Sequence, residues 1–349
     1  ETDVPEKQPV ATPSNGTEKE TQNDTVKTGI SGLVGLGNCA TAKAYRTTLS
    51  KLNIMAERVI VSTVADDGAV IAVSGSEKAM ENIADVKAEV MSDTDGFVER
   101  LNSGKEKTIK LDEEGVYLFK NLKSVYELSH GKYDITIGPL LDIWDFGAKE
   151  KREIPKKEDL KRAMQHIDFS KIILSGDELS FSELGVELDT GSFLKGYAVE
   201  KAKGVMREKG VTSAFISSIS SIETINRKPD GKKWRIGVEN PENPQKLLGV
   251  VELYNEGMGV SGDYQTYVEI DGKRYHHILD KITGFPVEDK KMVVVISDNA
   301  FFSDMYSTAF FLMDIDEVLN YADKNDLGVL IVDKDMKIFK NDKMKIELR

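Results

Sequence analysis

The 349-residue chain has little of three features that would assign it to a class at once: cysteine, long apolar runs and excess positive charge. Cys39 is its one cysteine, which excludes a disulfide within the chain. No run of 18 or more apolar residues occurs, so the sequence predicts no membrane-spanning helix. The net charge of −12 argues against nucleic-acid binding, which needs a basic surface. A small anionic ligand is still compatible with this negative net charge, because a local pocket can be positive or hold a metal ion.

Large apolar side chains are scarce in the first 28 residues, which are rich in Thr, Glu, Pro, Asn and Lys. Such a segment cannot bury enough surface to offset its chain entropy. We therefore expect a disordered tether over residues 1–40 and one domain over residues 41–349.

The start of the sequence carries no basic stretch followed by an apolar one, so no signal peptide is recognised in it. We expect that residue 1 was preceded by a signal peptide that has been removed, or by a lipid-modified cysteine. It would then be extracytoplasmic and tethered to the outer face of the cell membrane through an N-terminal lipid anchor. The alternative is a cytoplasmic protein with a flexible end.

Strand-like and helix-like segments alternate from about residue 57 onward. This order predicts an α+β fold, in a single compact domain with mixed sheets and flanking helices. The expected helices cover residues 76–91, 113–130, 158–165, 193–209 and 300–313. The expected strands cover residues 58–64, 69–73, 171–174, 179–181, 186–188, 214–219, 234–238, 248–253, 267–278, 292–296, 329–332 and 337–339.

A candidate phosphate site lies in residues 188–198. An expected strand ends at Asp189, small residues follow, and a helix begins with Lys195 in its first turn. Unpaired amides and the dipole of a helix start attract phosphate, and Lys195 adds a full positive charge. The alternative is a plain strand–turn–helix connection with a lysine on the surface.

A candidate metal site lies early in the helix expected over residues 300–313. Asp304 and Thr308 are four residues apart and therefore share one helix face. A carboxylate and a hydroxyl are hard oxygen ligands of the kind Mg²⁺ takes beside water and a substrate phosphate. The alternative is an acid that is favourable near a helix start for dipole reasons alone.

Two of the four histidines, His276 and His277, are adjacent on an expected strand and should point to opposite sides. At most one of them can face a given pocket, where histidine can take a proton from an attacking hydroxyl. A zinc site is disfavoured, because no cysteine or third histidine lies at a ligand spacing. The alternative is a pair of surface or core histidines.

Residues 131–144 place a Gly-Pro break beside aromatic side chains. Such a segment can form a wall for a flat heterocycle. Aromatic residues more often belong to the core, so we expect this segment to be structural by default.

In this order the four segments resemble the FAD:protein FMN transferase family, often called the ApbE family. The family pattern F/Y-D-x-T-x-G-P-L is matched from Tyr133 to Leu140, and L-D-x-G-x-x-x-K-G-Y-A from Leu188 to Ala198. The patterns S-G-D-Y and D-G-K-R-Y-H-H-I are matched at residues 261–264 and 271–278, and A-D-x-x-S-T-A at residues 303–309 except at its first position. The resemblance covers about residues 95–315.

The resemblance implies the family's compact α+β scaffold, described as T-fold-like, with Mg²⁺ and with FAD as substrate. It implies that Mg²⁺ is held by Asp304 and Thr308, with Ser307 close by and the main-chain oxygen of Ser192. It implies contacts with FAD from Tyr133, Asp134, Asp189, Lys195, His277 and Ile278.

The implied reaction moves FMN from FAD to a serine or threonine hydroxyl of an acceptor protein with an FMN-binding domain, and AMP leaves. His277 or Asp263 is the candidate base. One alternative is a magnesium-dependent FAD pyrophosphatase, in which water replaces the acceptor hydroxyl. Another is a protein that binds FAD without catalysis.

Three departures from the family pattern concern the ends of the flavin nucleotide more than the metal. Residues 217–221 are serine-rich where the family has a Gly-Gly pair. Residues 279–281 read Leu-Asp-Lys where the family has Ile-Asp-Pro. The family's Met-Gly-Thr near the start is not identified.

Overall fold

The computed structural model describes residues 97–147, 153–208, 212–218, 220–228 and 230–349, together with the backbone of two strands at residues 59–64 and 70–75. The tether expected over residues 1–40 and the helix expected over residues 76–91 lie outside the described residues. No described helix has the length and apolar character needed to cross a membrane.

An eight-stranded sheet forms the centre of the molecule, and all of its ladders are antiparallel. Runs of β-branched residues such as Val293–Val295 are fully buried, as expected for strands covered on both faces. In sheet order the strands are β15 (Ile338–Lys340), β14 (Gly328–Asp333), β13 (Lys290–Ser297), β10 (Gly257–Gly262), β7 (Ser221–Ile225), β6 (Ala214–Ser218), β1 (Val59–Val64) and β2 (Val70–Gly75).

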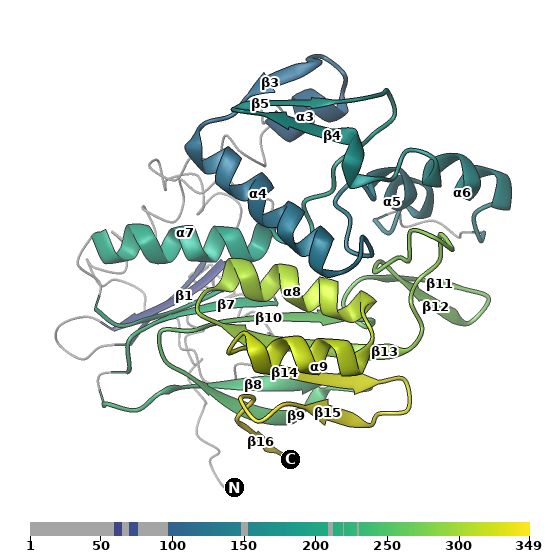
Figure 1. Cartoon of the computed structure of the whole chain (residues 1–349). Helices are drawn as coiled ribbons and strands as arrows, with labels where there is room; N and C mark the ends of the chain where they lie inside the picture. The colour runs from purple at the N-terminus through teal and green to yellow at the C-terminus, as the bar shows by residue number, and fades with distance from the viewer. Residues whose placement is uncertain are drawn as a thin grey trace, which may run out of the picture.

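Helices cover one face of this sheet (Figure 1). Helices α7 (Leu194–Glu208) and α8 (Ala300–Leu312) lie side by side on it, and α4 (Glu113–Leu128) packs on α8. Helix α9 (Ile315–Lys324) follows α8 and contacts β14. The largest apolar core fills the space between these helices and the sheet, and α8 contributes fully buried phenylalanines to it.

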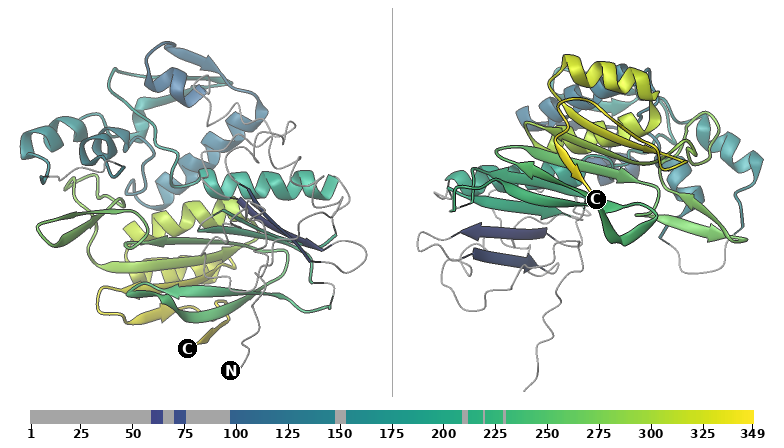
Figure 2. Two further views of the ribbon diagram at one scale, coloured as in Figure 1. Left: turned by 180° about the vertical axis from the view of Figure 1, so that it is seen from behind. Right: turned by 90° about the horizontal axis from the view of Figure 1, so that it is seen from below.

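The opposite face of the large sheet is covered by a three-stranded antiparallel sheet (Figure 2). A second core, which includes Trp234 and Val251, lies between the two sheets. The covering strands, in sheet order, are β16 (Ile346–Leu348), β9 (Asn243–Leu253) and β8 (Trp234–Asn240).

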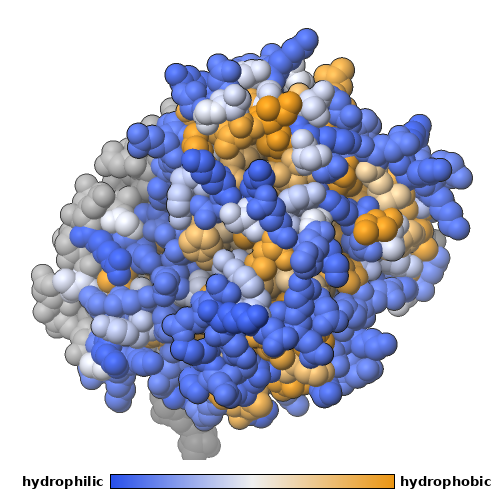
Figure 3. All heavy atoms as spheres, viewed as in Figure 1, coloured by the Kyte–Doolittle hydropathy of each residue, from blue (hydrophilic) through white to orange (hydrophobic). Residues whose placement is uncertain are grey.

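Smaller elements surround the helical layer. Helix α5 (Gly138–Trp144), helix α6 (Lys157–Met164) and the hairpin of β11 (Tyr267–Ile270) and β12 (Lys273–His276) share a third apolar cluster around Trp144. The face of the molecule seen in Figure 1 is mostly hydrophilic, with apolar side chains in separate patches (Figure 3). The remaining elements are α3 (Phe97–Asn102), β3 (Thr108–Lys110), β5 (Glu178–Phe181), the short 3-10 helix Phe169–Lys171 and β4 (Ile172–Ser175).

The α+β prediction is confirmed, and so are the helices that became α4, α6, α7 and α8. The strand predicted over residues 186–188 is wrong, because this segment makes one isolated parallel bridge, between Glu187 and Ile137. Between the named strands of the described residues all pairings are antiparallel, so this bridge outside them is the one parallel pairing there. Helices α3, α5 and α9 and strands β3, β7, β10 and β16 were not predicted.

Candidate functional site

The segment before α7 is a tight turn, held by hydrogen bonds between residues 189 and 195. The Thr190 carbonyl accepts the amides of Phe193 and Leu194, at 3.2 and 2.9 Å. The Gly191 amide donates to Asp189 Oδ2 at 3.0 Å. Lys195 Nζ returns to the Gly191 carbonyl at 2.8 Å, so the lysine lies over the turn.

Asp304 of α8 faces this turn from the neighbouring helix. Its Oδ2 accepts the Gly196 amide at 2.8 Å and lies 3.9 Å from Lys195 Nζ. Gly196 permits the contact, because a Cβ there would lie 2.2 Å from the Ala300 carbonyl oxygen. The sequence predicts a phosphate site at this turn and a metal ligand at Asp304. The two therefore lie together where α7 contacts α8.

Burial raises the pKa of the Asp304 carboxyl above its ordinary value, because the charged form loses its hydration. Lys195, the Gly196 amide and the Ser221 hydroxyl oppose this rise by favouring the carboxylate. The pKa of Asp189 is also raised by burial, and Lys195 again opposes the rise. Lys195 is thus the positive charge shared by the two acids of the site.

Three hydroxyl groups continue the site along α8. Ser261 Oγ of β10 lies 2.8 Å from Ser307 Oγ and 3.0 Å from Thr308 Oγ1. Ser307 also donates to the Asp304 carbonyl at 2.9 Å, so its hydroxyl is committed to the helix. At Gly259 of β10, a Cβ would lie 2.3 Å from the Ser303 carbonyl oxygen, so the strand can approach this helix because a side chain is missing.

The oxygen atoms gathered here fit a hard divalent cation. Within the described residues no three His, Cys, Asp or Glu side chains cluster as metal ligands. Mg²⁺ does not need such a cluster, since it is held by one or two carboxylates together with water and substrate phosphates. The Asp304 carboxylate and the Thr308 hydroxyl suit this role. The buried Ser221 hydroxyl lacks a well-formed hydrogen bond to the protein and so remains available beside Asp304.

Ser192 and Tyr133 are in contact with each other, and Tyr133 lies near Asp304. Tyr133 is buried, and its hydroxyl lies 2.9 Å from Ser192 Oγ. The Tyr133 pKa is raised by burial and by nearby Asp304 and Asp189, so the phenol stays neutral. The main-chain ladder of α7 starts with the Tyr197 amide on the Phe193 carbonyl, one residue after Ser192. The Gly196 amide, which could otherwise bond the Ser192 carbonyl, is turned to Asp304.

Asp134 is surrounded by donors from its own protein. Oδ1 accepts the amide and the hydroxyl of Thr136, at 3.0 and 2.7 Å. Oδ2 accepts the Phe169 amide at 3.1 Å and the Lys281 ammonium at 2.7 Å. These bonds show Asp134 organising the loop before α5, and its contact with FAD stays a prediction.

The two adjacent histidines do different things, as their opposite orientation requires. His276 uses both ring nitrogens internally: Nε2 lies 2.6 Å from the Val287 carbonyl, and Nδ1 accepts the Ile278 amide at 3.2 Å. His277 Nδ1 lies 3.1 Å from the Thr266 carbonyl, which fixes the proton on Nδ1 and leaves Nε2 with a lone pair. Burial lowers the pKa of His277 to about 4, and Lys195 contributes to that shift, which places the ring near the site.

Asp263 and Ile278 are less closely tied to this centre. Burial raises the Asp263 pKa, and the charged groups that modify it are Lys291, Arg274 and Glu242 rather than Lys195. Ile278 is buried in the main apolar core. The structure therefore brings Lys195, Asp304 and Thr308 close to Ser192 and Tyr133, with His277 near Lys195.

The sequence prediction missed Ser261, Ser221 and Lys281 as members of the site. Ser261 lay in a quoted motif, but its partnership with Thr308 depends on how β10 lies on α8. Ser221 lies in the serine-rich segment that departs from the family pattern. Lys281 had no local signal, because its partner is 147 residues away.

Comparison with known proteins identifies relatives of this arrangement. The model of the ApbE family matches residues 51–331. The FAD:protein FMN transferase of Haemophilus influenzae is 27% identical over 282 residues, which cover 76% of this chain and 81% of that protein. The FAD:protein FMN transferase of Vibrio cholerae is 27% identical over 210 residues, 59% of this chain but 63% of that protein. The crystal structure of the ApbE protein of Thermotoga maritima superposes with a TM-score of 0.68 at 28% identity, covering 74% of this chain and 85% of that one.

Proposed function

We propose, from the premise that this chain belongs to the ApbE family, that it is a flavin transferase that moves FMN from FAD to another protein. The observation that carries the proposal is the meeting of Lys195 and Asp304 at the start of α7, 3.9 Å apart and largely withdrawn from water. A helix start with a lysine is suited to the phosphates of FAD. The carboxylate beside it is suited to a cation that binds those phosphates.

Mg²⁺ is the cation that we propose, held by the Asp304 carboxylate, the Thr308 hydroxyl and the Ser192 carbonyl, with Ser307 close by. When bound, it would neutralise charge on the bridging phosphates of FAD. Lys195 and the amides of the turn would stabilise the remaining negative charge, in a site already arranged before the ligand arrives.

The transfer is a displacement at the FMN-side phosphorus of FAD. A serine or threonine oxygen of the acceptor forms the new O–P bond, while the bond from this phosphorus to the bridging oxygen breaks and AMP leaves. The proton of the hydroxyl passes to a base, for which His277 Nε2 is the better candidate. His277 is neutral near pH 7 because its pKa is lowered to about 4, and it lies near Lys195. Asp263 is the second candidate.

Mass spectrometry of an acceptor protein tests the proposal. The chain is incubated with FAD, Mg²⁺ and an FMN-binding domain that carries the acceptor threonine, and we expect one FMN mass to be added with release of AMP. The same domain with alanine at the acceptor threonine is the matched control. Release of AMP and free FMN without modified acceptor would identify an FAD pyrophosphatase instead, and FAD binding with neither product would identify a carrier.

We also propose an extracytoplasmic location, with the N-terminal segment as a tether to the outer face of the membrane. The support is the composition of the first 28 residues. Protease treatment of intact cells tests it: degradation of the protein while a cytoplasmic marker survives supports the proposal. Protection from protease until the membrane is broken would contradict it.

A further inference from the structure

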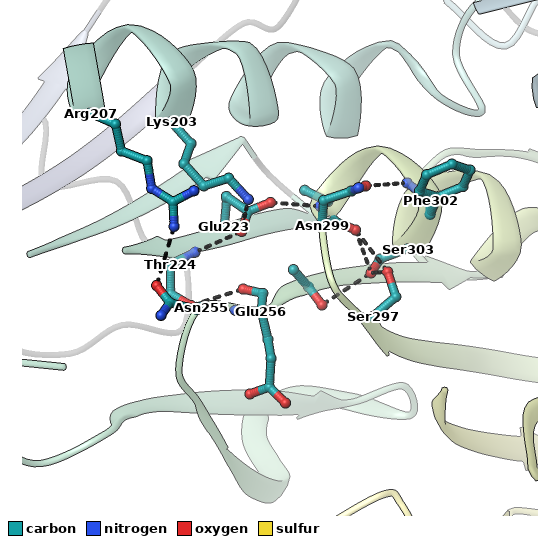
Figure 4. A network of polar contacts seen from close by, with 12 residues as sticks. Lys203, Arg207, Glu223, Thr224, Asn255, Glu256, Ser297, Asn299, Phe302 and Ser303 are labelled. Carbon is teal, nitrogen blue, oxygen red and sulfur yellow. Dashed lines mark hydrogen bonds and ion pairs between the residues drawn. The ribbon is translucent and has the colours of Figure 1, made fainter. Parts of the chain in front are cut away.

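A buried ion pair lies next to the site and takes no direct part in it (Figure 4). Glu223 of β7 is fully buried, and its Oε1 lies 2.9 Å from Nζ of Lys203 on α7. Its Oε2 accepts the Ala300 amide at 2.7 Å, the first amide of α8. One carboxylate thus connects α7, β7 and the start of α8.

The pair joins the same two helices as the contact that forms the site, one helical turn away on α8 and two turns away on α7. Glu223 and Ser221 are two apart on β7 and so share the face that looks toward the helices. On α8, Ala300 is one turn before Asp304, and on α7, Lys203 is two turns after Gly196. The first layer joins Gly196 to Asp304 at 2.8 Å beside Ser221, and the second joins Lys203 to Ala300 through Glu223.

The start of α8 is fixed by other polar contacts that Figure 4 shows together. Asn299 Oδ1 caps the helix by accepting the Phe302 amide at 3.0 Å. Ser303 Oγ donates to the Gly257 carbonyl of β10 at 3.0 Å and lies 2.8 Å from Ser297 Oγ at the end of β13. These bonds tie α8 to β10 and β13. Among the contacts drawn in Figure 4, only Glu223 ties the helix start to α7.

Stability alone does not account for a charged pair at this depth. Burying two ions costs hydration free energy that their attraction often fails to recover, and apolar residues of similar volume can replace such a pair without loss. The raised pKa of Glu223, which is caused by burial and opposed by Lys203, reflects that cost. A geometric role explains the pair better, because the carboxylate fixes two donors on two helices at once.

We infer that Lys203 and Glu223 are positioning residues that set the placement of α8 against α7, and so hold the Asp304 carboxylate on the Gly196 amide at the start of α7. Neither residue touches substrate or cation. The consequence for flavin transfer rests on the proposed function, whereas the placement of Asp304 does not.

Glu223→Gln tests the inference, because it keeps the size of the side chain and removes the charge that holds Lys203. Hydrogen exchange of the Gly196 amide, normalised to amides of the second core, reports the bond to Asp304 without any ligand. We expect that amide to exchange at least about tenfold faster. Mn²⁺ binding without FAD, followed by electron paramagnetic resonance, should weaken by a similar factor, since the Ser192 carbonyl before α7 loses its fixed spacing from the ligands on α8.

A double variant and a control separate placement from stability. Lys203→Met with Glu223→Gln leaves no unpaired buried charge, so its Tm should return toward the parent value while Gly196 exchange stays fast. Val251→Ala, in the second core away from α7 and α8, should lower Tm without changing normalised Gly196 exchange or Mn²⁺ affinity.

Parent-like Gly196 exchange in both the single and the double variant would overturn the inference, whatever happens to Tm. If Glu223→Gln does not fold, the double variant decides by the same measurement. If the parent chain bound no Mn²⁺, the metal part of the proposed function would fail, and Gly196 exchange would still decide the positioning role.

Discussion

At the scale of single residues, Lys195 is the one charged group among the described residues that acts on Asp189, Asp304 and His277 alike. It opposes the raised pKa of both Asp189 and Asp304 and contributes to the lowered pKa of His277. Its ammonium donates to the Gly191 carbonyl and lies 3.9 Å from Asp304 Oδ2. One charge therefore favours the ionised form of two acids and the neutral form of one histidine, against burial in the first case and together with it in the second.

Lys195→Met should weaken FAD binding or turnover by about tenfold or more, because a charge-assisted hydrogen bond to phosphate is worth roughly 1.5–3 kcal/mol. The apolar stem is kept, so we expect Tm to change by only a few degrees. Isothermal titration with FAD and with riboflavin measures the effect, and the loss should be smaller for riboflavin, which has no phosphate. Equal losses for the two ligands would show that Lys195 does not bind the phosphates.

Asp304→Asn should abolish the cation site with little effect on folding. Asparagine retains an oxygen for the Gly196 amide, and burial already disfavours the charged carboxylate, as its raised pKa shows. We expect turnover to fall by about 100-fold or more, since a catalytic metal ion contributes several kcal/mol. Steady-state rates across a Mg²⁺ titration, with Tm measured alongside, check this. A variant that is fully active in chelator would rule out the cation.

His277 should make stability depend on pH in a definite direction. Its pKa is lowered from 6.5 to about 4, so between these values the unfolded chain binds the proton that the folded protein lacks. The contribution of His277 therefore grows as the pH rises from about 4 to 6.5 and is complete above that window. Parent and His277→Gln are compared by urea unfolding at pH 4.5, 5.5 and 7.

The free energy of unfolding of His277→Gln, relative to the parent, should rise as the pH falls, by up to roughly 3 kcal/mol across the window. A difference that stays constant with pH would mean that the ring titrates normally and is in contact with water.

At the scale of elements, the close contact between α7 and α8 places the residues of the site together, and it depends on a glycine. Gly196 lies against α8, where a Cβ would meet the Ala300 oxygen at 2.2 Å and the Asp304 Cβ at 2.5 Å. Gly204, on the same helix, is exposed and has no atom within 4 Å of a Cβ.

Gly196→Ala should therefore destabilise the protein by about 1–3 kcal/mol through overpacking. Gly204→Ala should stabilise it by roughly 0.5–1 kcal/mol through helix propensity. Thermal unfolding of the two variants beside the parent measures both. Shifts of the same sign would contradict the close packing of the helices.

The sequence predicted elements whose signals are local. The end of helix α4 was predicted from Gly131, a glycine with φ +77° whose amide bonds the Tyr126 carbonyl. Helix α9 had an equally local signal, since Asp314 caps it and Ile315, Val318 and Ala322 follow helical spacing, but it was overlooked. Strand β7 had no such signal, because its polar residues are buried on both faces and owe that burial to β6, β10 and two helices.

The sequence motifs predicted which residues form the candidate site, but not which residues bond to one another within it. Asp304, Thr308 and Lys195 stand out by their spacing and type within short segments. The bond from Gly196 to Asp304 spans 108 residues, and no local pattern encodes it. The same holds for Glu223, which reads as one more acid on a polar segment until the fold places it between two helices.

At the scale of the whole molecule, the large sheet separates two cores with different tasks. The core between the two sheets contains none of the proposed site residues and supports the sheet from behind. The core on the other face includes α7 and α8, so the site lies within the same apolar cluster that holds the fold together. The proposed cation ligands and the stability of the domain are thus linked by packing.

The burial of α8 has a consequence for how the protein loses activity. A helix that supplies two of the proposed cation ligands, Asp304 and Thr308, and also anchors the main core cannot detach while the rest of the domain stays folded. A partially unfolded form should therefore have no activity, and activity should be lost together with the folded structure. In increasing urea, loss of Mn²⁺ affinity and loss of the far-ultraviolet helical signal should follow one curve, so each remaining active molecule counts as one fully folded molecule.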